Sequence, residues 1–190
     1  VVFMGMGEPF LNYHCVLKAA DIFHNQKGFG LAAQRITIST AGILPKIKRF
    51  FNEAHRYKLA ISLNATNNKL RDKIMPINKK WPIEELINIA QEYSKKQNIV
   101  MFEYVLLDGI NDSVSDAKKL ADLLSGINCK LNIIPYNETD DQFKRPSIEK
   151  MDLFLKVLAD NQKGFRIMVR WSKGQDIDAG CGQLATKVYD

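Results

Sequence analysis

Residues Ile99 to Pro135 are the clearest indication of the fold of this 190-residue chain. This stretch begins with Ile-Val-Met-Phe-Glu-Tyr-Val-Leu-Leu (99–107) and ends with Lys-Leu-Asn-Ile-Ile-Pro (130–135), two runs that are almost continuously apolar. Such runs are typical of strands that are covered on both faces, as in parallel sheets. Between them, apolar residues recur at helical spacing, at Ala117, Leu120, Ala121 and Leu124. The stretch therefore predicts a strand–helix–strand unit with a right-handed crossover.

The same alternation extends over the rest of the chain and predicts an α/β protein with one domain. Strand-like runs occupy residues 1–5, 35–40, 58–64, 99–107, 130–135 and 166–171. Helical spacing occurs within residues 16–23, 43–54, 83–90, 117–124 and 148–158, and Ser113 and Ser147 stand where helix caps are expected. Six strands of this kind form either a doubly wound sheet or part of a barrel, and the pattern leaves both open.

Composition limits the class of protein further. The chain is 46% hydrophobic, enough for one sizeable core, and has no apolar run near 18 residues, so no membrane span is expected. Its three cysteines, at positions 15, 129 and 181, are too few and too far apart for a disulfide framework, and we expect a reduced, cytoplasmic protein. The net charge of +6 is a minor indication of a polyanionic partner.

Polar residues gather where the predicted strands end, which is where both candidate folds place their ligands. They are Gly7-Glu8-Pro9, Ser39-Thr40 with Gly42, Ser62-Leu63-Asn64, the turn 108–112, and Asn137. These residues provide hydrogen-bond acceptors and small donors, and the sequence contains no Gly-x-Gly-x-x-Gly and no Walker loop. Each motif alone is ordinary turn chemistry. Together they suit a zwitterionic, nucleoside-like ligand.

Cys181 lies near the end of the chain, in the small-residue loop Gly-Gln-Asp-Ile-Asp-Ala-Gly-Cys-Gly-Gln-Leu-Ala (174–185). A thiol between glycines is sterically open and can act as a nucleophile or as a methyl acceptor. Many such cysteines are only small turn residues. The pattern by itself leaves open whether Cys181 is a reactive thiol or a turn residue.

Seven motifs in this order resemble the RlmN/Cfr family of radical S-adenosylmethionine RNA methyltransferases. They are FMGMGEP (3–9), RITISTAG (35–42), LAISLNA (59–65), MPIN (75–78), FEYVLLDG (102–109), NIIPYN (132–137) and DIDAGCGQLA (176–185). The resemblance covers essentially the whole chain. It implies a partial (β/α)6 barrel and methylation of C2 of an adenine in 23S ribosomal RNA, with transfer RNA as a further substrate of some members.

The resemblance also implies roles for single residues. Gly7 and Glu8 would hold the methionyl ammonium of S-adenosylmethionine, and a carboxylate suits this because charge-assisted hydrogen bonds are strong. Cys181 would take a methyl group from one S-adenosylmethionine. A 5′-deoxyadenosyl radical from a second would abstract hydrogen from that S-methyl group, and the carbon radical would add to the adenine, whose C2 is not nucleophilic. The remaining cofactor contacts would come from Ser39, Ser62, Leu63, Asn64 and Asn137.

The sequence departs from the family pattern in two ways. Asn64 stands where the family usually has histidine, which keeps a hydrogen-bonding side chain but loses an ionisable one. The Cys-x-x-x-Cys-x-x-Cys loop that binds the 4Fe–4S cluster is absent from residues 1–190, as are the resolving cysteine and the N-terminal RNA-binding domain. Since the chain also opens on a strand-like run, we expect the C-terminal part of a truncated radical SAM barrel, monomeric and inactive alone.

Other functions and roles remain open. The alternatives are methylation at C8, as in Cfr, and a non-catalytic RNA-binding α/β module. Cys15 and Cys129 are expected to be buried structural thiols, and Glu103 either points into the barrel or carries a structural ion pair. The basic groups 69/71/73 and 79/80 are expected to be solvated, whereas those at 144/145 and 166/170/173 are equally open to phosphate contact with RNA.

Overall fold

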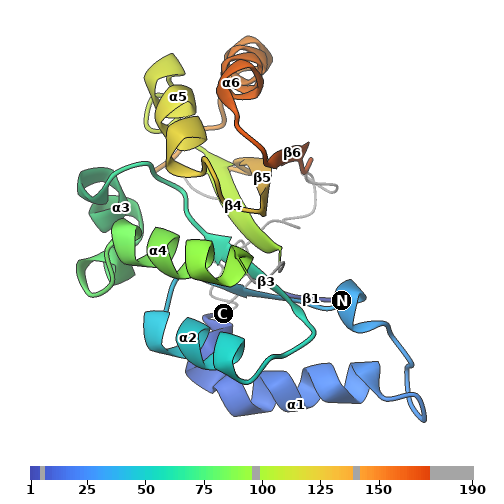
Figure 1. Ribbon diagram of the computed structural model, residues 1–190. Helices are drawn as coiled ribbons and strands as arrows, with labels where there is room; N and C mark the ends of the chain where they lie inside the picture. The colour runs from blue at the N-terminus through green and yellow to red at the C-terminus, as the bar shows by residue number, and fades with distance from the viewer. Residues whose placement is uncertain (5–6, 96–98, 139–141, 172–190) are drawn as a thin grey trace, which may run out of the picture.

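The computed structural model describes residues 1–4, 7–95, 99–138 and 142–171. Its centre is one six-stranded sheet in which each strand runs parallel to its neighbours (Figure 1). The strands are β1 (Val2–Phe3), β2 (Thr37–Thr40), β3 (Lys58–Ser62), β4 (Val100–Leu106), β5 (Cys129–Pro135) and β6 (Arg166–Val169). Each of them overlaps one of the six predicted runs.

Helices connect the strands. They are α1 (Tyr13–His24), α2 (Leu44–Asn52), α3 (Asn68–Ile74), α4 (Ile83–Ser94), α5 (Val114–Leu123) and α6 (Ile148–Asn161), with 3₁₀ turns η1 (Pro9–Asn12), η2 (Ala33–Arg35) and η3 (Pro76–Lys79). Five helices match the predicted patterns. The sequence did not predict α3, because its seven residues are too few and too polar to show an apolar period. Within the described residues, no helix is long and apolar enough to cross a membrane.

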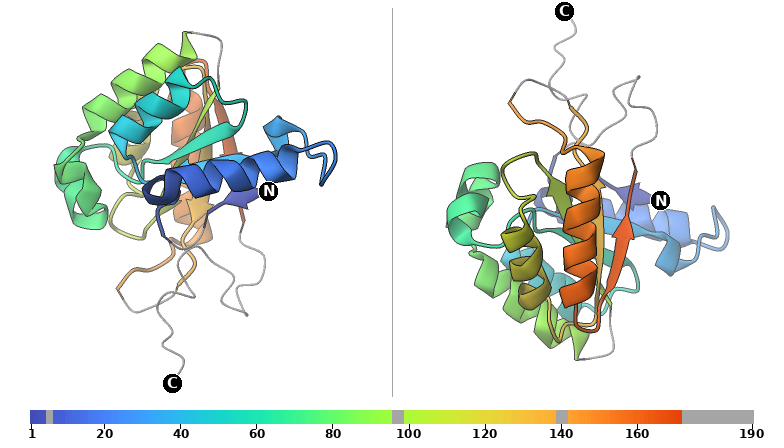
Figure 2. Two further views of the ribbon diagram at one scale, coloured as in Figure 1. Left: turned by 90° about the horizontal axis from the view of Figure 1, so that it is seen from below. Right: turned by 90° about the horizontal axis from the view of Figure 1, so that it is seen from above.

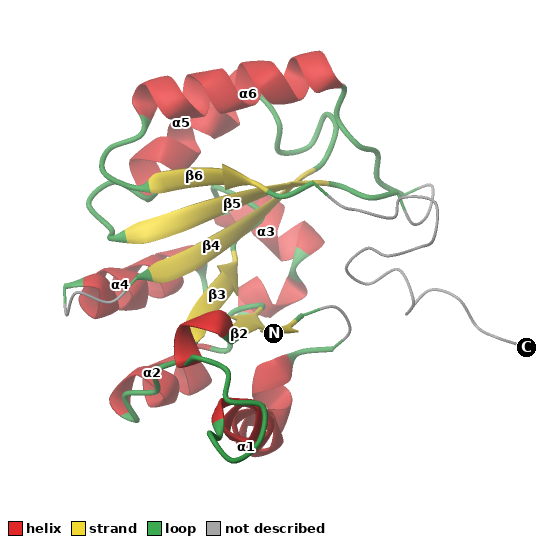
Figure 3. Cartoon of the chain, turned by 90° about the vertical axis from the view of Figure 1, so that its right-hand side faces the viewer, coloured by secondary structure: helices red, strands yellow, loops and turns green. Residues whose placement is uncertain are grey.

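The order of the strands in the sheet is the same as their order along the chain. Right-handed crossovers place every helix on the same side when the strand order never reverses. The helices accordingly lie outside a curved sheet, with α5 and α6 over β4–β6 and with α1, α2 and α4 beside the other strands (Figure 2 and Figure 3). A doubly wound sheet would carry helices on both faces, so the structure decides for the barrel arrangement.

The sheet also curls toward closure. β1 and β6 are its outer strands, yet Nη1 of Arg170, just after β6, lies 3.4 Å from the sulfur of Met4, just after β1. In a flat sheet, six strands spaced about 4.8 Å apart would hold their outer members about 24 Å apart. The described strands therefore form a barrel wall whose two edges approach each other at the carboxyl ends.

The two faces of the sheet differ in polarity. Ile61 and Phe102 belong to the continuous apolar core under the helices. Side chains alternate along a strand, so the residues next to them point the other way, into the barrel. Ser62, Glu103 and Asn132 occupy neighbouring register positions on this inner face. The inner face is polar, and polar residues therefore line the space where a ligand would enter.

Two predicted helix starts are confirmed. Ser113 forms a capping box with Asp116: its hydroxyl accepts a hydrogen bond from the Asp116 N–H at 3.1 Å, and the Asp116 carboxylate accepts one from the Ser113 N–H at 3.3 Å. Ser147 caps α6 by accepting a hydrogen bond from the N–H of Lys150 at 3.3 Å. Both caps satisfy backbone donors that the first helical turn leaves without partners.

The expectation of a buried first cysteine is wrong. Cys15 is exposed, because the buried face of α1 passes through Tyr13, Leu17 and Ala20. Cys15 is two positions from Tyr13 and from Leu17, about 200° around the helix, so it faces away from the core. Cys129 is buried as predicted, and burial raises the pKa of its thiol to about 12.

Candidate functional site

The predicted site residues lie where the parallel strands end. Gly7 and Glu8 follow β1, Ser39 is the next-to-last residue of β2, Ser62 ends β3, and Asn137 follows β5. The carboxyl ends of parallel strands share one edge of a sheet, so these residues lie at the same end of the barrel. The predicted methyl carrier, Cys181, lies outside the described residues.

The carboxylate of Glu8 is held by three hydrogen bonds from the protein. Its Oε1 accepts from the N–H of Phe10 at 3.0 Å and from the hydroxyl of Thr40 at 2.8 Å, and its Oε2 accepts from the N–H of Ala41 at 2.6 Å. Gly7 precedes it with φ +75°, which glycine adopts without strain. A carboxylate has about four acceptor positions. Glu8 thus ties the end of β1 to the end of β2 and keeps about one position for a ligand.

Ser39 points into the barrel, where its hydroxyl donates a 2.8 Å hydrogen bond to Oε2 of Glu103. Ser39 and Glu103 are 8% and 6% exposed. They belong to β2 and β4, and Ala60 of the intervening β3, which pairs with Ser39, is small enough to let them meet. Glu103 therefore points into the barrel, and it makes no ion pair with any described residue.

The residues at the end of β3 present different groups. Ser62 is half-buried, whereas Leu63 is 0% exposed and its side chain belongs to the hydrophobic core. Leu63 can therefore offer a ligand only backbone groups, and its N–H already donates to the carbonyl of Glu103 at 2.8 Å.

Asn64 uses its side chain to join β3 to its surroundings. Its Oδ1 accepts from the N–H of Val105 in β4 at 2.9 Å, and its Nδ2 donates to the sulfur of Met75 at 3.3 Å. Its φ is +57°, a left-handed conformation that asparagine tolerates better than most residues. Both ends of the side-chain amide have partners in the protein, so Asn64 shapes the site more directly than it offers groups to it.

A buried arginine organises these strand ends, and the expectation that it is solvated is wrong. Arg71 of α3 is 0% exposed. It donates to the carbonyls of Leu63 at 3.0 Å, Ser62 at 2.9 Å and Ala41 at 2.8 Å, and to Oδ1 of Asn78 at 3.0 Å. A guanidinium has five donors in a fixed fork, which lets it satisfy several carbonyls at once. Burial lowers the pKa of Arg71 to about 10, so it remains a cation at neutral pH.

Asn111 has the same function one strand further on. It is 0% exposed, and its Nδ2 donates to the carbonyls of Asn64 at 2.9 Å and Val105 at 2.8 Å. Its Oδ1 accepts from the N–H of Leu107 at 2.8 Å, and its carbonyl accepts from the hydroxyl of Tyr104 at 2.9 Å. In the sequence this residue is only one polar member of the turn 108–112, with no spacing that would reveal its burial. Asn111 fixes the end of β4 against the end of β3.

The side-chain amide of Asn137 is a candidate donor to a ligand. Its Nδ2 is buried and has no hydrogen-bond partner among the described residues. A buried donor without a partner costs about 1–3 kcal/mol, so an acceptor on a bound molecule would stabilise it. This donor and the remaining acceptor position of Glu8 fit a ligand such as S-adenosylmethionine, which carries both an ammonium and nucleoside acceptors. An iron–sulfur cluster does not fit the described residues, since no group of three His, Cys, Asp or Glu side chains among them could hold a metal ion.

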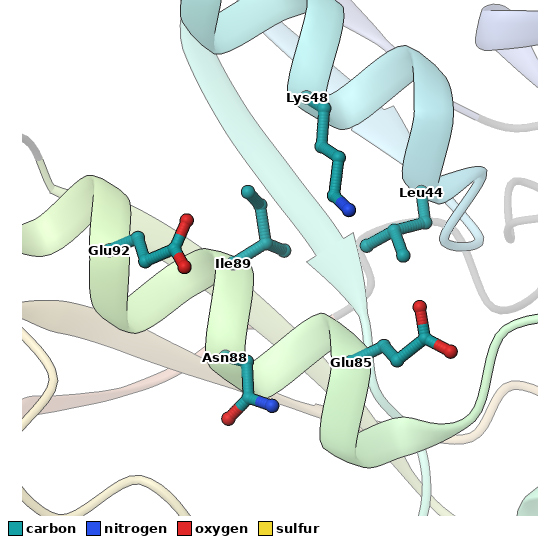
Figure 4. A pocket seen from close by; sticks show the side chains of 6 residues that line it. All are labelled: Leu44, Lys48, Glu85, Asn88, Ile89 and Glu92. Carbon is teal, nitrogen blue, oxygen red and sulfur yellow. The ribbon is translucent and has the colours of Figure 1, made fainter.

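A hollow elsewhere on the surface is separate from this site. It has a volume of about 230 Å³ and lies between α2 and α4 (Figure 4). Its lining residues are Leu44, Lys48, Glu85, Asn88, Ile89 and Glu92. All of them belong to the outer helices, and none is a predicted site residue.

A curled parallel sheet with outer helices and polar strand ends defines a partial barrel with a candidate ligand site at its mouth. The chain belongs to the radical SAM superfamily, whose family model matches residues 1–124. It is 45% identical over 188 residues to a probable dual-specificity RNA methyltransferase RlmN from Thermotoga sp. (strain RQ2), covering 98% of this chain and 54% of that protein. It is 44% identical over 194 residues to the dual-specificity RNA methyltransferase RlmN of Vesicomyosocius okutanii, covering 100% of this chain and 54% of that protein. The chain thus spans about half the length of the curated relatives it matches.

Two solved structures are also similar to this chain. A radical SAM methyltransferase from Sphaerobacter thermophilus is similar with a TM-score of 0.89 and 44% identity, covering 96% of this chain and 53% of that one. A domain of pyruvate-formate lyase-activating enzyme from Bacteroides vulgatus is similar with a TM-score of 0.66 and 18% identity, covering 90% of this chain and 98% of that domain. The second likeness shows the fold alone.

Proposed function

We propose that this chain is the catalytic part of an enzyme that methylates RNA by radical SAM chemistry, at C2 of an adenine in 23S ribosomal RNA and also in transfer RNA. One observation carries the proposal: 45% identity to a probable RNA methyltransferase extends over 98% of the chain. That similarity includes every strand end described above. The relatives are about twice as long as this chain, so the proposal concerns the full-length, cytoplasmic enzyme.

The strand-end residues would bind S-adenosylmethionine, which together with a 4Fe–4S cluster would supply the methyl group and the radical. Glu8 would accept a hydrogen bond from the ammonium through its remaining acceptor position. Asn137 would donate to a nucleoside acceptor through Nδ2, which has no described partner. Ser62 would contact the ligand at the end of β3. Leu63 and Asn64 would shape the wall beside it, because the Leu63 backbone groups and the Asn64 amide already have partners in the protein. Ser39 would help to shape the inner wall through its hydrogen bond to Glu103.

Cys181 would carry the methyl group. C2 of adenine is not nucleophilic, so the methyl carbon must react as a radical. A donor residue must therefore hold the methyl group near the adenine ring. The two described cysteines are poor candidates for this role. Cys15 is exposed on the outer helix α1, and Cys129 is a buried residue at the first position of β5, at the end of the strand opposite Asn137. An open, glycine-flanked thiol is the better carrier.

The test uses the full-length enzyme, prepared without oxygen and loaded with its cluster. It is supplied with methyl-labelled S-adenosylmethionine and 23S ribosomal RNA, and the RNA is then digested to nucleosides for mass spectrometry. We expect 2-methyladenosine, a methylated Cys181 peptide, no product from Cys181→Ala, and product from the matched control Cys15→Ala. Formation of 8-methyladenosine would indicate the Cfr reaction instead. RNA binding without methylation would indicate a non-catalytic module.

A further inference from the structure

Most of the net charge of the chain is concentrated in residues 66–82, called here the α3–η3 unit. This unit contains five basic side chains and one acidic one, so its net charge is +4 out of +6 for the whole chain. One basic residue is the buried Arg71, and the other four are exposed. None of these four makes an ion pair with a described residue. They are Lys69, Lys73, Lys79 and Lys80.

A polar network beneath the lysines holds the unit in one shape. Asn78 of η3 accepts from Arg71 at 3.0 Å and donates to Oδ1 of Asn68 at 2.9 Å and of Asp72 at 2.6 Å. Nδ2 of Asn68 in turn donates to both carboxylate oxygens of Glu84, at 2.8 and 2.9 Å. The two nearby acids are therefore hydrogen-bonded to asparagines of the network, and neither is paired with an exposed lysine.

Two observations describe how lysines are arranged on the α3–η3 unit. Lys69 and Lys73 are four residues apart in α3, so they share one face of the helix. Just after η3, Nζ of Lys80 lies 4.8 Å from the centre of the Trp81 ring, which restricts where that amino group points. Ordered cations lose less conformational freedom on binding than free ones do.

The unit adjoins the candidate site. It follows Ser62–Asn64 in the chain, and Arg71 anchors it to the carbonyls of Ser62 and Leu63. Figure 3 shows α3 on the side of β3 toward which that strand points. A polyanion that entered the mouth of the barrel would pass beside the α3–η3 unit.

We propose that Lys69, Lys73, Lys79 and Lys80 bind the phosphate backbone of the RNA substrate beside the mouth of the barrel. The inference rests on the proposed function in taking RNA as the partner. Lysines bind phosphates as point charges without reading the sequence, and each contact releases condensed counterions. This surface differs from the basic groups 144/145 and 166/170/173, which the sequence leaves open to phosphate contact. In those groups, the Arg145 guanidinium lies 5.5 Å from the centre of the Trp171 ring and Arg170 contacts Met4.

The test compares two variants in which the same number of charges is removed. The first replaces the four lysines of the unit by glutamine (K69Q/K73Q/K79Q/K80Q). The matched control replaces four exposed lysines of α5, α6 and the turn after α6 (K118Q/K119Q/K156Q/K163Q). Circular dichroism and thermal melting establish that both are folded. Binding of a fluorescein-labelled RNA stem–loop to the full-length enzyme, unchanged or with either set of substitutions, is then followed by anisotropy at several salt concentrations.

We expect the first variant to bind RNA at least tenfold more weakly than the unchanged enzyme, and the control to change affinity less than threefold. Because the first variant can no longer neutralise four phosphates, its slope of log K against log salt should be less steep by about 3. Equal weakening in both variants, or no RNA binding by the unchanged enzyme, would overturn the proposal. Equally tight binding of labelled oligoglutamate would instead indicate an acidic protein partner.

Failure of this proposal can be told apart from failure of the proposed function. If the full-length enzyme methylates RNA while K69Q/K73Q/K79Q/K80Q binds RNA as the unchanged enzyme does, only the lysine surface is wrong. If the unchanged enzyme does not methylate RNA, the proposed function itself fails.

Discussion

Glu8 and Arg71 hold opposite ends of one residue, Ala41. Oε2 of Glu8 accepts from the N–H of Ala41 at 2.6 Å, and Nη2 of Arg71 donates to its carbonyl at 2.8 Å. An anion on the N–H and a cation on the carbonyl each form a charge-assisted hydrogen bond. The backbone after β2 is thus fixed between a residue that follows β1 and a residue of α3.

This shared contact predicts energetic coupling between Glu8 and Arg71. In a double-mutant cycle of Glu8→Gln and Arg71→Lys, we expect an interaction free energy of about 0.5–2 kcal/mol, because both residues act on the same segment of backbone. Urea unfolding of the four proteins measures it. Glu8→Gln combined with Ser147→Ala, a distant cap, should be additive within about 0.5 kcal/mol. Additivity in the first cycle as well would show that the contacts of Glu8 and Arg71 with Ala41 are not energetically coupled.

Replacing Arg71 by methionine should be strongly destabilising. The substitution removes the guanidinium donors to the carbonyls of Ser62 and Ala41 and to Oδ1 of Asn78, and an unsatisfied buried group costs about 1–3 kcal/mol. We expect a decrease of about 3 kcal/mol or more in the free energy of unfolding, and a smaller decrease for Arg71→Lys, which keeps the charge but not the fork. Lys73→Met, at an exposed position of the same helix, should stay within about 0.5 kcal/mol of the original. Equal stability of the two methionine variants would contradict this account.

Glu53 should make the stability of the protein depend on pH in acid. Hydrogen bonds from the Tyr13 hydroxyl, Arg49 and His55 lower the pKa of its carboxyl from 4.5 to about 2. A carboxylate whose pKa is lower in the folded state stabilises that state above the unfolded pKa and loses the effect as it is protonated. The free energy of unfolding should therefore fall more steeply between about pH 4.5 and pH 2 in the original protein than in Glu53→Gln. Parallel pH profiles of the two proteins would refute the assignment.

The two described cysteines should differ sharply in reactivity. In a Cys181→Ser background at pH 8, iodoacetamide should modify the exposed Cys15 readily and leave the buried Cys129 unmodified until the protein is unfolded. With a pKa of about 12, only about one Cys129 thiol in ten thousand is ionised at that pH. Peptide mass spectrometry before and after denaturation gives the result. Rapid modification of Cys129 in the folded protein would mean that β5 opens locally.

Much of the candidate site was accessible from the sequence because its residues sit at strand ends. Glu8, Ser62 and Asn137 could be located by where apolar runs stop. Their supporting residues could not be found in this way. Arg71 stands between two exposed lysines, and Asn111 lies within an ordinary turn. Nothing in their neighbours distinguishes a buried polar side chain from a solvated one.

The strands, most of the helices and two of their caps could be predicted from the sequence, because apolar periodicity and capping depend on residues close together in the chain. The distinction between a barrel and a doubly wound sheet required the three-dimensional structure, since it depends on the order in which distant strands pair. The tertiary structure also decided which side of α1 is buried and therefore that Cys15 is exposed. The roles of Arg71 and Asn111 belong to the tertiary structure as well. Their hydrogen-bond partners include carbonyls at the ends of other strands, and these come within reach only after the sheet has formed.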